Sequence, residues 1–304
     1  MTGIPMRVLG RTGLKTTLIG FGALEIGRDW GVGSPQERRR PDEAEAGDTL
    51  RCVLGLGVNL IDTASAYHRS EERVGKSVHE RRKEFVLATK CGEHNREPDT
   101  YYDFSYAAVR DSIETSLRLL QTEVIDILQI HFGPDPDKVL DDGGCVQAMK
   151  EARAAGKVRF LGASVNGTVL DRCIGSGDFD VVQVGYSLLN QTDGDLIAKA
   201  QARGIGVLIR SGLAGGWLTS RALGKTKEER PAGVNLLFDL CKGDAELVTS
   251  LALHFIARNS GVSSILIGSK SCENVKNAIR LITSAPDPGL LEKAADLARD
   301  SAKP

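Results

Sequence analysis

The chain has 304 residues, of which 41% are hydrophobic and 26% charged, proportions typical of a globular protein. Its formal net charge of −1 argues against a surface for nucleic acid or anionic membrane, because neither sign of charge dominates. A small molecule is therefore the expected partner.

The sequence also bears on compartment and redox chemistry. The first residues, MTGIPMRVLGRTG, lack the apolar core of a signal peptide, and no apolar run approaches the ~18 residues of a membrane span, so a cytoplasmic location is expected. Widely spaced cysteines without a CxxC pair favour reduced thiols over a zinc site or a disulfide framework. The six are Cys52, Cys91, Cys145, Cys173, Cys241 and Cys272.

The N-terminal part of the chain reads as a hairpin followed by a strand and a long loop. Segments 6–9 and 14–16 flank Gly10-Arg11-Thr12-Gly13, which predicts a short hairpin. The apolar segment 18–22 predicts a strand, and the stretch 27–43, rich in Gly, Pro and charge, predicts a loop. Trp30 in this loop is expected either to form part of a substrate wall or to pack the loop onto the protein.

Beyond this point, strands and helices alternate. Helical spacing of apolar residues occurs, for example, in segments 44–55, 71–81, 105–120 and 244–258, and a terminal helix includes 294–299. Segments 91–103 and 132–144 are predicted loops. Strands are expected at 18–22, 58–61, 85–89, 125–130, 160–164, 181–184, 206–209 and 264–267. This alternation predicts a single α/β domain over residues 1–304, a (β/α)8 TIM barrel with an extra C-terminal helix.

Polar side chains follow three consecutive predicted strands. Asp62 closes one strand and Tyr67 lies five residues later, while Lys90 and His131 directly follow the next two strands. The C-terminal ends of barrel strands share the face that carries the active site, so these four side chains are expected to meet. Alone, each has a structural explanation, such as a turn acceptor, a solvated strand end or a satisfied histidine.

The contexts IDTASAY and LATK, with His131 after the next strand, resemble the Asp/Tyr/Lys/His tetrad of the aldo-keto reductases. That family comprises NAD(P)-dependent carbonyl and alcohol oxidoreductases built on a TIM barrel, and the resemblance covers roughly residues 7–282. It implies that the N-terminal hairpin closes the bottom of the barrel. Lys90, held by Asp62, is expected to lower the pKa of Tyr67 so that this phenol serves as general acid. His131 is expected to hydrogen-bond the substrate oxygen, and the scheme needs no metal.

A nicotinamide cofactor is expected without a Rossmann site, because no GxGxxG follows a strand. The resemblance implies that Ser164 or Asn166 holds the nicotinamide amide, with Gln183 as its partner and Tyr186 stacked on the ring. The segment RSGLAGG after strand seven is expected to bind pyrophosphate, and the helix start after strand eight is a natural anion site. The implied contacts in these two segments are Arg210, Ser211, Gly212, Leu213, Gly215, Gly268, Ser269, Lys270 and Asn274.

The choice between NADP and NAD depends on this last segment. Lys270 could pair with a 2′-phosphate, which favours NADP. Asn274 stands where many relatives have an arginine, and Ala278 stands where they have an adenine-contacting asparagine, so NAD stays possible.

Three functions remain open. The first is NADPH-dependent reduction of an aldehyde or ketone. The second is NAD-dependent oxidation of a sugar, because TKCG, DFS and HFG resemble the aldose 1-dehydrogenase branch that includes L-galactose dehydrogenases. The third is a cofactor-binding regulatory subunit. His68 and His94 are expected either in the substrate pocket or in solvent, and the sequence does not predict the oligomeric state.

Overall fold

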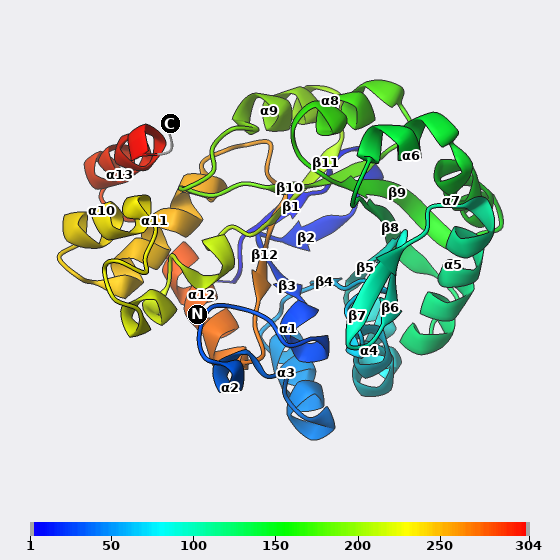
Figure 1. The fold of residues 1–304 in the computed structure, drawn as a ribbon, viewed down its shortest axis with the longest axis horizontal. Coiled ribbons are helices and arrows are strands. Elements are labelled where there is room, and N and C mark those ends of the chain that lie inside the picture. Colours follow the sequence, from blue (N-terminus) through cyan, green and yellow to red (C-terminus); the bar gives the residue numbers. More distant parts are fainter. Residues whose placement is uncertain (1–2, 302–304) are drawn as a thin grey trace.

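The computed structural model describes residues 3–301, and its centre is a closed barrel of eight parallel strands (Figure 1). Each predicted barrel strand is present, so the TIM barrel is confirmed. The strands are β3 (Ile19–Gly22), β4 (Leu60–Asp62), β5 (Val86–Cys91), β8 (Ile125–His131), β9 (Val158–Ser164), β10 (Val181–Gly185), β11 (Gly206–Arg210) and β12 (Ser264–Gly268). The ring closes where β12 pairs with β3, the last strand with the first.

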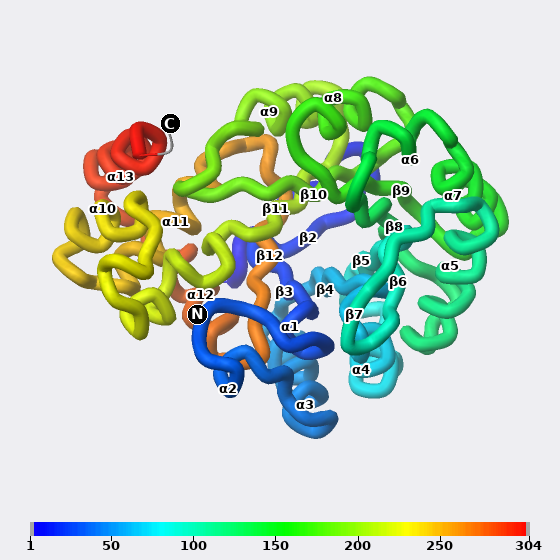
Figure 2. The backbone as a smooth tube through the Cα atoms, in the orientation of Figure 1, coloured from blue at the N-terminus to red at the C-terminus, as the bar shows by residue number. Residues whose placement is uncertain are grey.

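Helices surround this barrel, as the path of the chain in Figure 2 shows. Apolar residues on their inner faces join the outward-facing strand residues in one large core. The helices that follow the strands are α3 (Glu43–Gly55), α4 (Ser70–Val78), α5 (Tyr106–Leu120), α7 (Gly144–Ala154), α8 (Gly167–Ser176), α9 (Gly194–Ala202), α11 (Ala245–Ala257) and α12 (Cys272–Ile282). Further helices are α1 (Leu24–Gly27), α2 (Pro35–Arg38), α6 (Pro136–Asp142), α10 (Ala232–Leu240) and α13 (Pro288–Ser301), and α13 packs against α10 and α11. Within residues 3–301, no helix is long and apolar enough to cross a membrane.

The N-terminal hairpin closes one end of the barrel, as expected from the family resemblance. Its strands are β1 (Met6–Val8) and β2 (Lys15–Thr17), and Leu9 between them is fully buried among the side chains that fill the barrel interior. Gly10 has φ 50°, and a Cβ there would lie 2.3 Å from the backbone nitrogen of Gly206. Only glycine allows this close approach, which holds the hairpin against the barrel floor.

All three segments predicted as loops contain regular structure. Segment 91–103 forms an antiparallel hairpin of β6 (Glu93–Arg96) and β7 (Asp99–Tyr102), because Thr100 and the following tyrosines favour extended backbone. Segment 27–43 contains α2, which begins with a capping box between Ser34 and Glu37. Segment 132–144 contains α6, which begins at Pro136, a residue that the first turn of a helix tolerates. The polar composition of the three segments concealed these elements. The β6–β7 hairpin stands at the C-terminal end of β5 and β8 (Figure 1).

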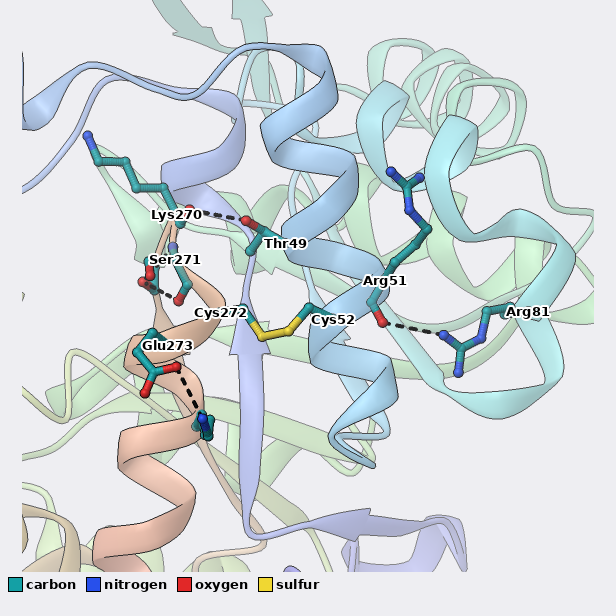
Figure 3. The surroundings of a disulfide bond; sticks show 10 residues. Thr49, Arg51, Cys52, Arg81, Lys270, Ser271, Cys272 and Glu273 are labelled. Atoms are coloured by element: carbon teal, nitrogen blue, oxygen red, sulfur yellow. Dashed lines mark hydrogen bonds and ion pairs between the residues drawn. A yellow bond between two sulfur atoms is a disulfide. The ribbon is translucent and has the colours of Figure 1, made fainter.

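The prediction of reduced thiols is wrong for two of the six cysteines. Cys52 of α3 and Cys272, the first residue of α12, form a disulfide (Figure 3). The two lie 220 residues apart, so their spacing gave no signal, but the pairing of β12 with β3 makes α3 and α12 neighbours. The other four cysteines are buried and free.

Behind the strand that carries Lys90, α4 buries an unusual acid. Glu71 is 2% exposed, and its Oε1 accepts a hydrogen bond of 2.6 Å from the hydroxyl of Thr89. Burial raises the pKa of the Glu71 carboxyl to about 7. A carboxyl with a raised folded-state pKa stabilises the fold fully below its unfolded pKa, and this contribution is lost as the pH rises through about 7.

The substitution Glu71→Gln should therefore raise the free energy of unfolding at pH 8 by up to about 3 kcal/mol and change it little at pH 4 to 5. Urea denaturation at both pH values measures this. Glu72→Gln is the matched control, because Glu72 lies on the same helical turn and its pKa is lowered by Lys76. Equal effects of Glu71→Gln at both pH values would show that Glu71 is not a buried neutral acid.

Candidate active site

The centre of the site is an ion pair at the C-terminal ends of β4 and β5. Lys90 Nζ donates to Asp62 Oδ2 at 2.6 Å and to the backbone oxygen of Thr63 at 2.8 Å. Lys90 is 0% and Asp62 3% exposed. Burial opposes the charge on Lys90, but Asp62 and Tyr67 outweigh it and raise the Lys90 pKa above its ordinary value. The Lys90 side chain is therefore a charged ammonium that is buried from solvent.

Two glutamines complete the surroundings of Asp62. Its Oδ1 accepts from Gln129 Nε2 at 2.9 Å and from Gln183 Nε2 at 2.8 Å. Both carboxylate oxygens thus have buried donors, which is the condition under which a buried charge is tolerated. Asp62 joins the ends of β4, β5, β8 and β10, so it fixes Lys90 against the rest of the barrel.

Tyr67 sits in a turn that starts one residue after β4. Its backbone NH donates to Ala64 at 3.0 Å, and its carbonyl accepts from Ser70 at 2.9 Å. Gly27 packs directly on this turn, since a Cβ there would lie 2.1 Å from the Tyr67 carbonyl oxygen. Lys90 Nζ lies 4.9 Å from the centre of the Tyr67 ring.

The expected lowering of the Tyr67 pKa is not what the surroundings produce. Burial has the largest influence and raises this pKa, and the lowering by Lys90 does not outweigh it. The sequence identified the nearby ammonium of Lys90, but it did not show how deeply the phenol of Tyr67 is buried. Tyr67 is therefore a neutral hydrogen-bond donor at neutral pH.

His131 completes the predicted group of four and brings a partner that the sequence did not reveal. Its ring meets that of Tyr67 edge to face, with centres 5.8 Å apart. Nδ1 lies 2.8 Å from Glu93 Oε2, a close contact between imidazole and carboxylate that does not have the geometry of a hydrogen bond. Glu93, on β6, is 7% exposed, and its Oε1 accepts from the Thr100 hydroxyl at 2.6 Å.

A cavity of about 870 Å³ opens beside these side chains. Asp62, Tyr67 and His131 line it, as do most residues expected to contact the cofactor. The expected cofactor residues in its wall are Ser164, Gln183, Arg210, Ser211, Gly212, Leu213, Gly215, Gly268 and Asn274. Of the two side chains left open above, Ser164 reaches the cavity. Asn166 instead donates to the carbonyl of Gly185 and accepts from Arg210.

Three other expected cofactor residues lie outside the cavity wall. Tyr186 stacks on Phe255 with ring centres 5.2 Å apart, so it packs the barrel against α11. Lys270 Nζ donates to the backbone oxygens of Glu37 and Arg39 at 2.6 Å each. Ser269 is buried, and its hydroxyl accepts from Asn274 at 3.0 Å.

Among the residues expected at the substrate, only Trp30 lines the cavity, with 49% of its surface exposed. The ring of His94 bonds the carbonyl oxygen of Asp103 at 2.8 Å and stacks on Tyr101. His68 adopts φ 47° in the loop after Tyr67, and its ring does not reach the cavity. Five further residues that line this part of the cavity come from segments predicted as loops, and they are Arg28, Glu93, Thr100, Tyr102 and Phe132.

The cavity fits a nicotinamide dinucleotide. Its volume is within the range of ~300–1,000 Å³ that ligand pockets occupy. The segment after β11 has left-handed backbone at Ser211, Ala214, Gly215 and Gly216, a conformation that forms anion-binding concavities from backbone NH groups. Gly22 and Gly268 face each other across β3 and β12, where a Cβ on Gly22 would lie 3.4 Å from the Gly268 backbone. Because neither glycine carries a side chain, this side of the cavity stays open.

An ion pair at the cavity rim was also unforeseen. Arg221, in the 3₁₀ turn Ser220–Gly224, donates to both oxygens of Glu25 at 3.2 and 3.0 Å. Glu25 follows β3, so this pair joins segments 196 residues apart across the cavity. Gln129 was foreseeable in principle, since it precedes His131 by two residues and so faces the same side of β8. In residues 3–301, no three His, Cys, Asp or Glu side chains gather as a metal site would require.

Comparison with known proteins decides the family. The aldo/keto reductase family model matches residues 18–286. The chain belongs to the aldo/keto reductase family. It is therefore an NAD(P)-dependent oxidoreductase, as the strand-end residues predicted.

Relatives within the family cover almost the whole chain. L-galactose dehydrogenase of Arabidopsis thaliana is 32% identical over 95% of this chain and 92% of its own. NADH-specific methylglyoxal reductase of Escherichia coli is 27% identical over 95% of this chain and 97% of its own. The holo form of aldo-keto reductase AKR11C1 from Bacillus halodurans superposes with a TM-score of 0.82 at 26% identity, covering 99% of this chain and 97% of that one.

Proposed function

We propose that the protein oxidises the hydroxyl at the anomeric carbon of an aldose, with NAD as the hydride acceptor. The observation that carries this proposal is the polar wall beside Tyr67 and His131. Arg28, Glu93 and Thr100 line the cavity there and supply both donors and acceptors for a hydroxylated substrate. Trp30 adds an aromatic face for the C–H groups of a sugar ring. The relative that is named for L-galactose supports the same substrate class.

The other end of the cavity favours NAD over NADP. The family resemblance places the adenosine near α12, where Asn274, Asn277 and Ala278 line the cavity together with Glu246. Arg280 lies beside that end, but its guanidinium pairs with Glu246 at 2.6 Å and donates to Asn277 Oδ1 at 2.7 Å, so it is already engaged within the protein. The ammonium of Lys270, the expected 2′-phosphate partner, is held by two carbonyls of the α2 segment. A relative that is named as NADH-specific agrees with this preference.

Each residue of the site has a separate role in the proposed oxidation. A nicotinamide bound in the cavity would accept hydride from the anomeric carbon. Tyr67 donates a hydrogen bond to the reacting oxygen and holds that oxygen in place. Lys90 and Asp62 fix the phenol and keep a positive potential beside it. Ser164 and Gln183 are the polar groups at the ends of β9 and β10 that would orient the nicotinamide amide.

Initial rates test the proposal. NAD⁺ with a panel of aldoses should give kcat/KM values at least about tenfold above those for NADP⁺ with the same sugars, because the nearby cations, Lys270 and Arg280, are engaged in bonds within the protein. The lactone product should appear in equal amount to NADH. Turnover confined to NADPH with aromatic aldehydes would reject the proposal in favour of carbonyl reduction.

Cofactor binding gives an independent measurement. NADH and NADPH titrations followed by tryptophan fluorescence should show the tighter Kd for NADH. Trp30 lines the cavity and Trp217 follows the segment after β11, so both are placed to report binding. Trp30→Phe identifies the source of the signal. Tighter binding of NADPH would contradict the assignment of NAD.

A further inference from the structure

We propose that the substrate carries a carboxylate and that the guanidinium of Arg28 binds it. Arg28 is then the residue that selects a sugar acid, such as a hexuronate, over a neutral aldose. This inference rests on the proposed oxidation of an aldose, and it names the class of aldose.

The backbone holds Arg28 beside the reacting groups. Arg28 directly follows α1, and its NH donates to the carbonyl of Leu24 at 2.9 Å. The preceding residue, Gly27, packs on the turn of Tyr67 so closely that a Cβ would meet the Tyr67 carbonyl oxygen. Arg28 lines the same cavity as Tyr67 and His131. A ligand of Arg28 therefore lies in the cavity in which the reaction takes place.

The guanidinium of Arg28 is without a protein acceptor. Within residues 3–301, it forms no ion pair and donates no side-chain hydrogen bond. The two other arginines of the described cavity wall are engaged. Arg210 donates to Asn166 Oδ1 at 2.7 Å, and Arg221 pairs with Glu25. A guanidinium presents five N–H donors in a fork that matches a carboxylate, and those of Arg28 are left for a ligand.

One acidic side chain limits the charge that this ligand carries. Burial would raise the pKa of Glu93, but His131, Thr100 and Arg28 together lower it, so Glu93 is a carboxylate near Arg28. Its Oε1 accepts from Thr100 at 2.6 Å, and its Oε2 lies 2.8 Å from His131 Nδ1. Glu93 thus faces other groups but adds a negative charge to the wall. A carboxylate brings a single charge, whereas a phosphate brings up to two, and this difference favours the carboxylate.

An aromatic surface next to Arg28 suits the rest of the sugar. The guanidinium carbon lies 5.9 Å from the centre of the Trp30 ring, and Trp30 lines the cavity with half of its surface exposed. Tyr102 lines the cavity as well and is also partly exposed. The C–H groups of a sugar ring pack on such faces while its carboxylate reaches the guanidinium.

Matched pairs of sugars test the inference. Each hexuronate is compared with the aldohexose of the same configuration, for example galacturonate with galactose. The wild type should give a kcat/KM about 10- to 100-fold higher for the hexuronate, the gain expected from hydrogen bonds to a charged group. Arg28→Gln should lower kcat/KM for the hexuronate at least about tenfold more than for the aldohexose. Equal values for the two sugars in the wild type, or a sugar 6-phosphate preferred to both, would overturn the proposal.

Two variants separate recognition of the carboxylate from a general effect of charge. Arg96→Gln makes the same substitution at an arginine that stacks on Tyr101 outside the cavity wall, and it should keep the preference for the hexuronate. Arg28→Lys keeps the charge but loses the fork, so its preference should fall between those of the wild type and Arg28→Gln. A loss in Arg96→Gln as large as that in Arg28→Gln would show that the total surface charge sets the preference.

Binding without turnover gives a second readout. Methyl glycosides are blocked at the anomeric oxygen and are not oxidised. With NAD⁺ present, methyl galacturonide should bind at least about tenfold more tightly than methyl galactoside in calorimetry, and Arg28→Gln should remove the difference. Added salt should weaken the binding of the galacturonide to the wild type, because an ion pair that water reaches is screened. A galacturonide that binds no more tightly than the galactoside would contradict the role of Arg28.

The two proposals fail separately. If hexuronates have no advantage but sugars are still oxidised, the proposed oxidation stands and the assignment of Arg28 is wrong. If the protein only reduces aldehydes, the oxidation is wrong, and succinate semialdehyde compared with butanal then tests Arg28. A preference for the acidic aldehyde that Arg28→Gln removes would support carboxylate binding, and its absence would refute it.

Discussion

Tyr67→Phe should lower kcat/KM by about 10²–10³, the cost of removing one preorganised donor to the reacting oxygen. The phenyl ring keeps its edge-to-face contact with His131 and its place beside Lys90, so the cavity should retain its shape. Cofactor Kd, measured by fluorescence titration, should stay within about twofold. The loss should therefore appear in the chemical step, which single-turnover rates isolate.

Tyr102→Phe is the matched control for this change. Tyr102 also lines the cavity, but it comes from β7 and is 43% exposed. Its phenol is not joined to Lys90 or Asp62, and its removal should cost less than about tenfold. A Tyr67→Phe enzyme with wild-type rates would remove Tyr67 from the chemistry.

Lys90→Met should destabilise the fold by about 3–5 kcal/mol, because it leaves the Asp62 carboxylate buried without its cation. Methionine fills nearly the same volume, so the effect measures the charge rather than a cavity. Activity should fall as well, since no group then fixes the position of Tyr67 relative to Asp62. Chemical denaturation and initial rates measure the two losses separately.

The double variant Lys90→Met with Asp62→Asn separates stability from catalysis. Asparagine keeps an acceptor for Gln129 and Gln183 and removes the unpaired charge. Most of the lost stability should return, whereas the activity should not. A single Lys90→Met variant as stable as the wild type would show that the buried pair contributes no net stability, and recovery of activity in the double variant would show that the charges are dispensable.

Barrel strands and the four central polar residues could be read from the sequence because both depend on local patterns. Each predicted strand is a mostly apolar run of four to six residues, and Asp62, Lys90 and His131 stand directly at the ends of such runs. Parallel topology then places those ends together, whatever the intervening loops do.

Other features of the site depend on contacts that no local pattern encodes. Tyr186 follows β10 and resembles a ring-stacking residue, but its side chain lies against Phe255 of α11. Glu93 reaches His131 only because its segment folds into a hairpin, and short polar segments do not reveal strand pairing. Lys270 was assigned to a phosphate because its nearest acceptors, two carbonyls of a segment more than 230 residues earlier, could not be foreseen.

The disulfide between α3 and α12 affects how the barrel unfolds. These helices lie beside the contact between β3, the first strand of the ring, and β12, the last. Force on the two chain ends would separate the barrel at this contact. The bond between Cys52 and Cys272 bridges this strand contact covalently and closes the chain between the two residues into a loop. In the oxidised molecule α3 and α12 therefore stay tethered to each other when the barrel unfolds, whereas reduction allows them to separate.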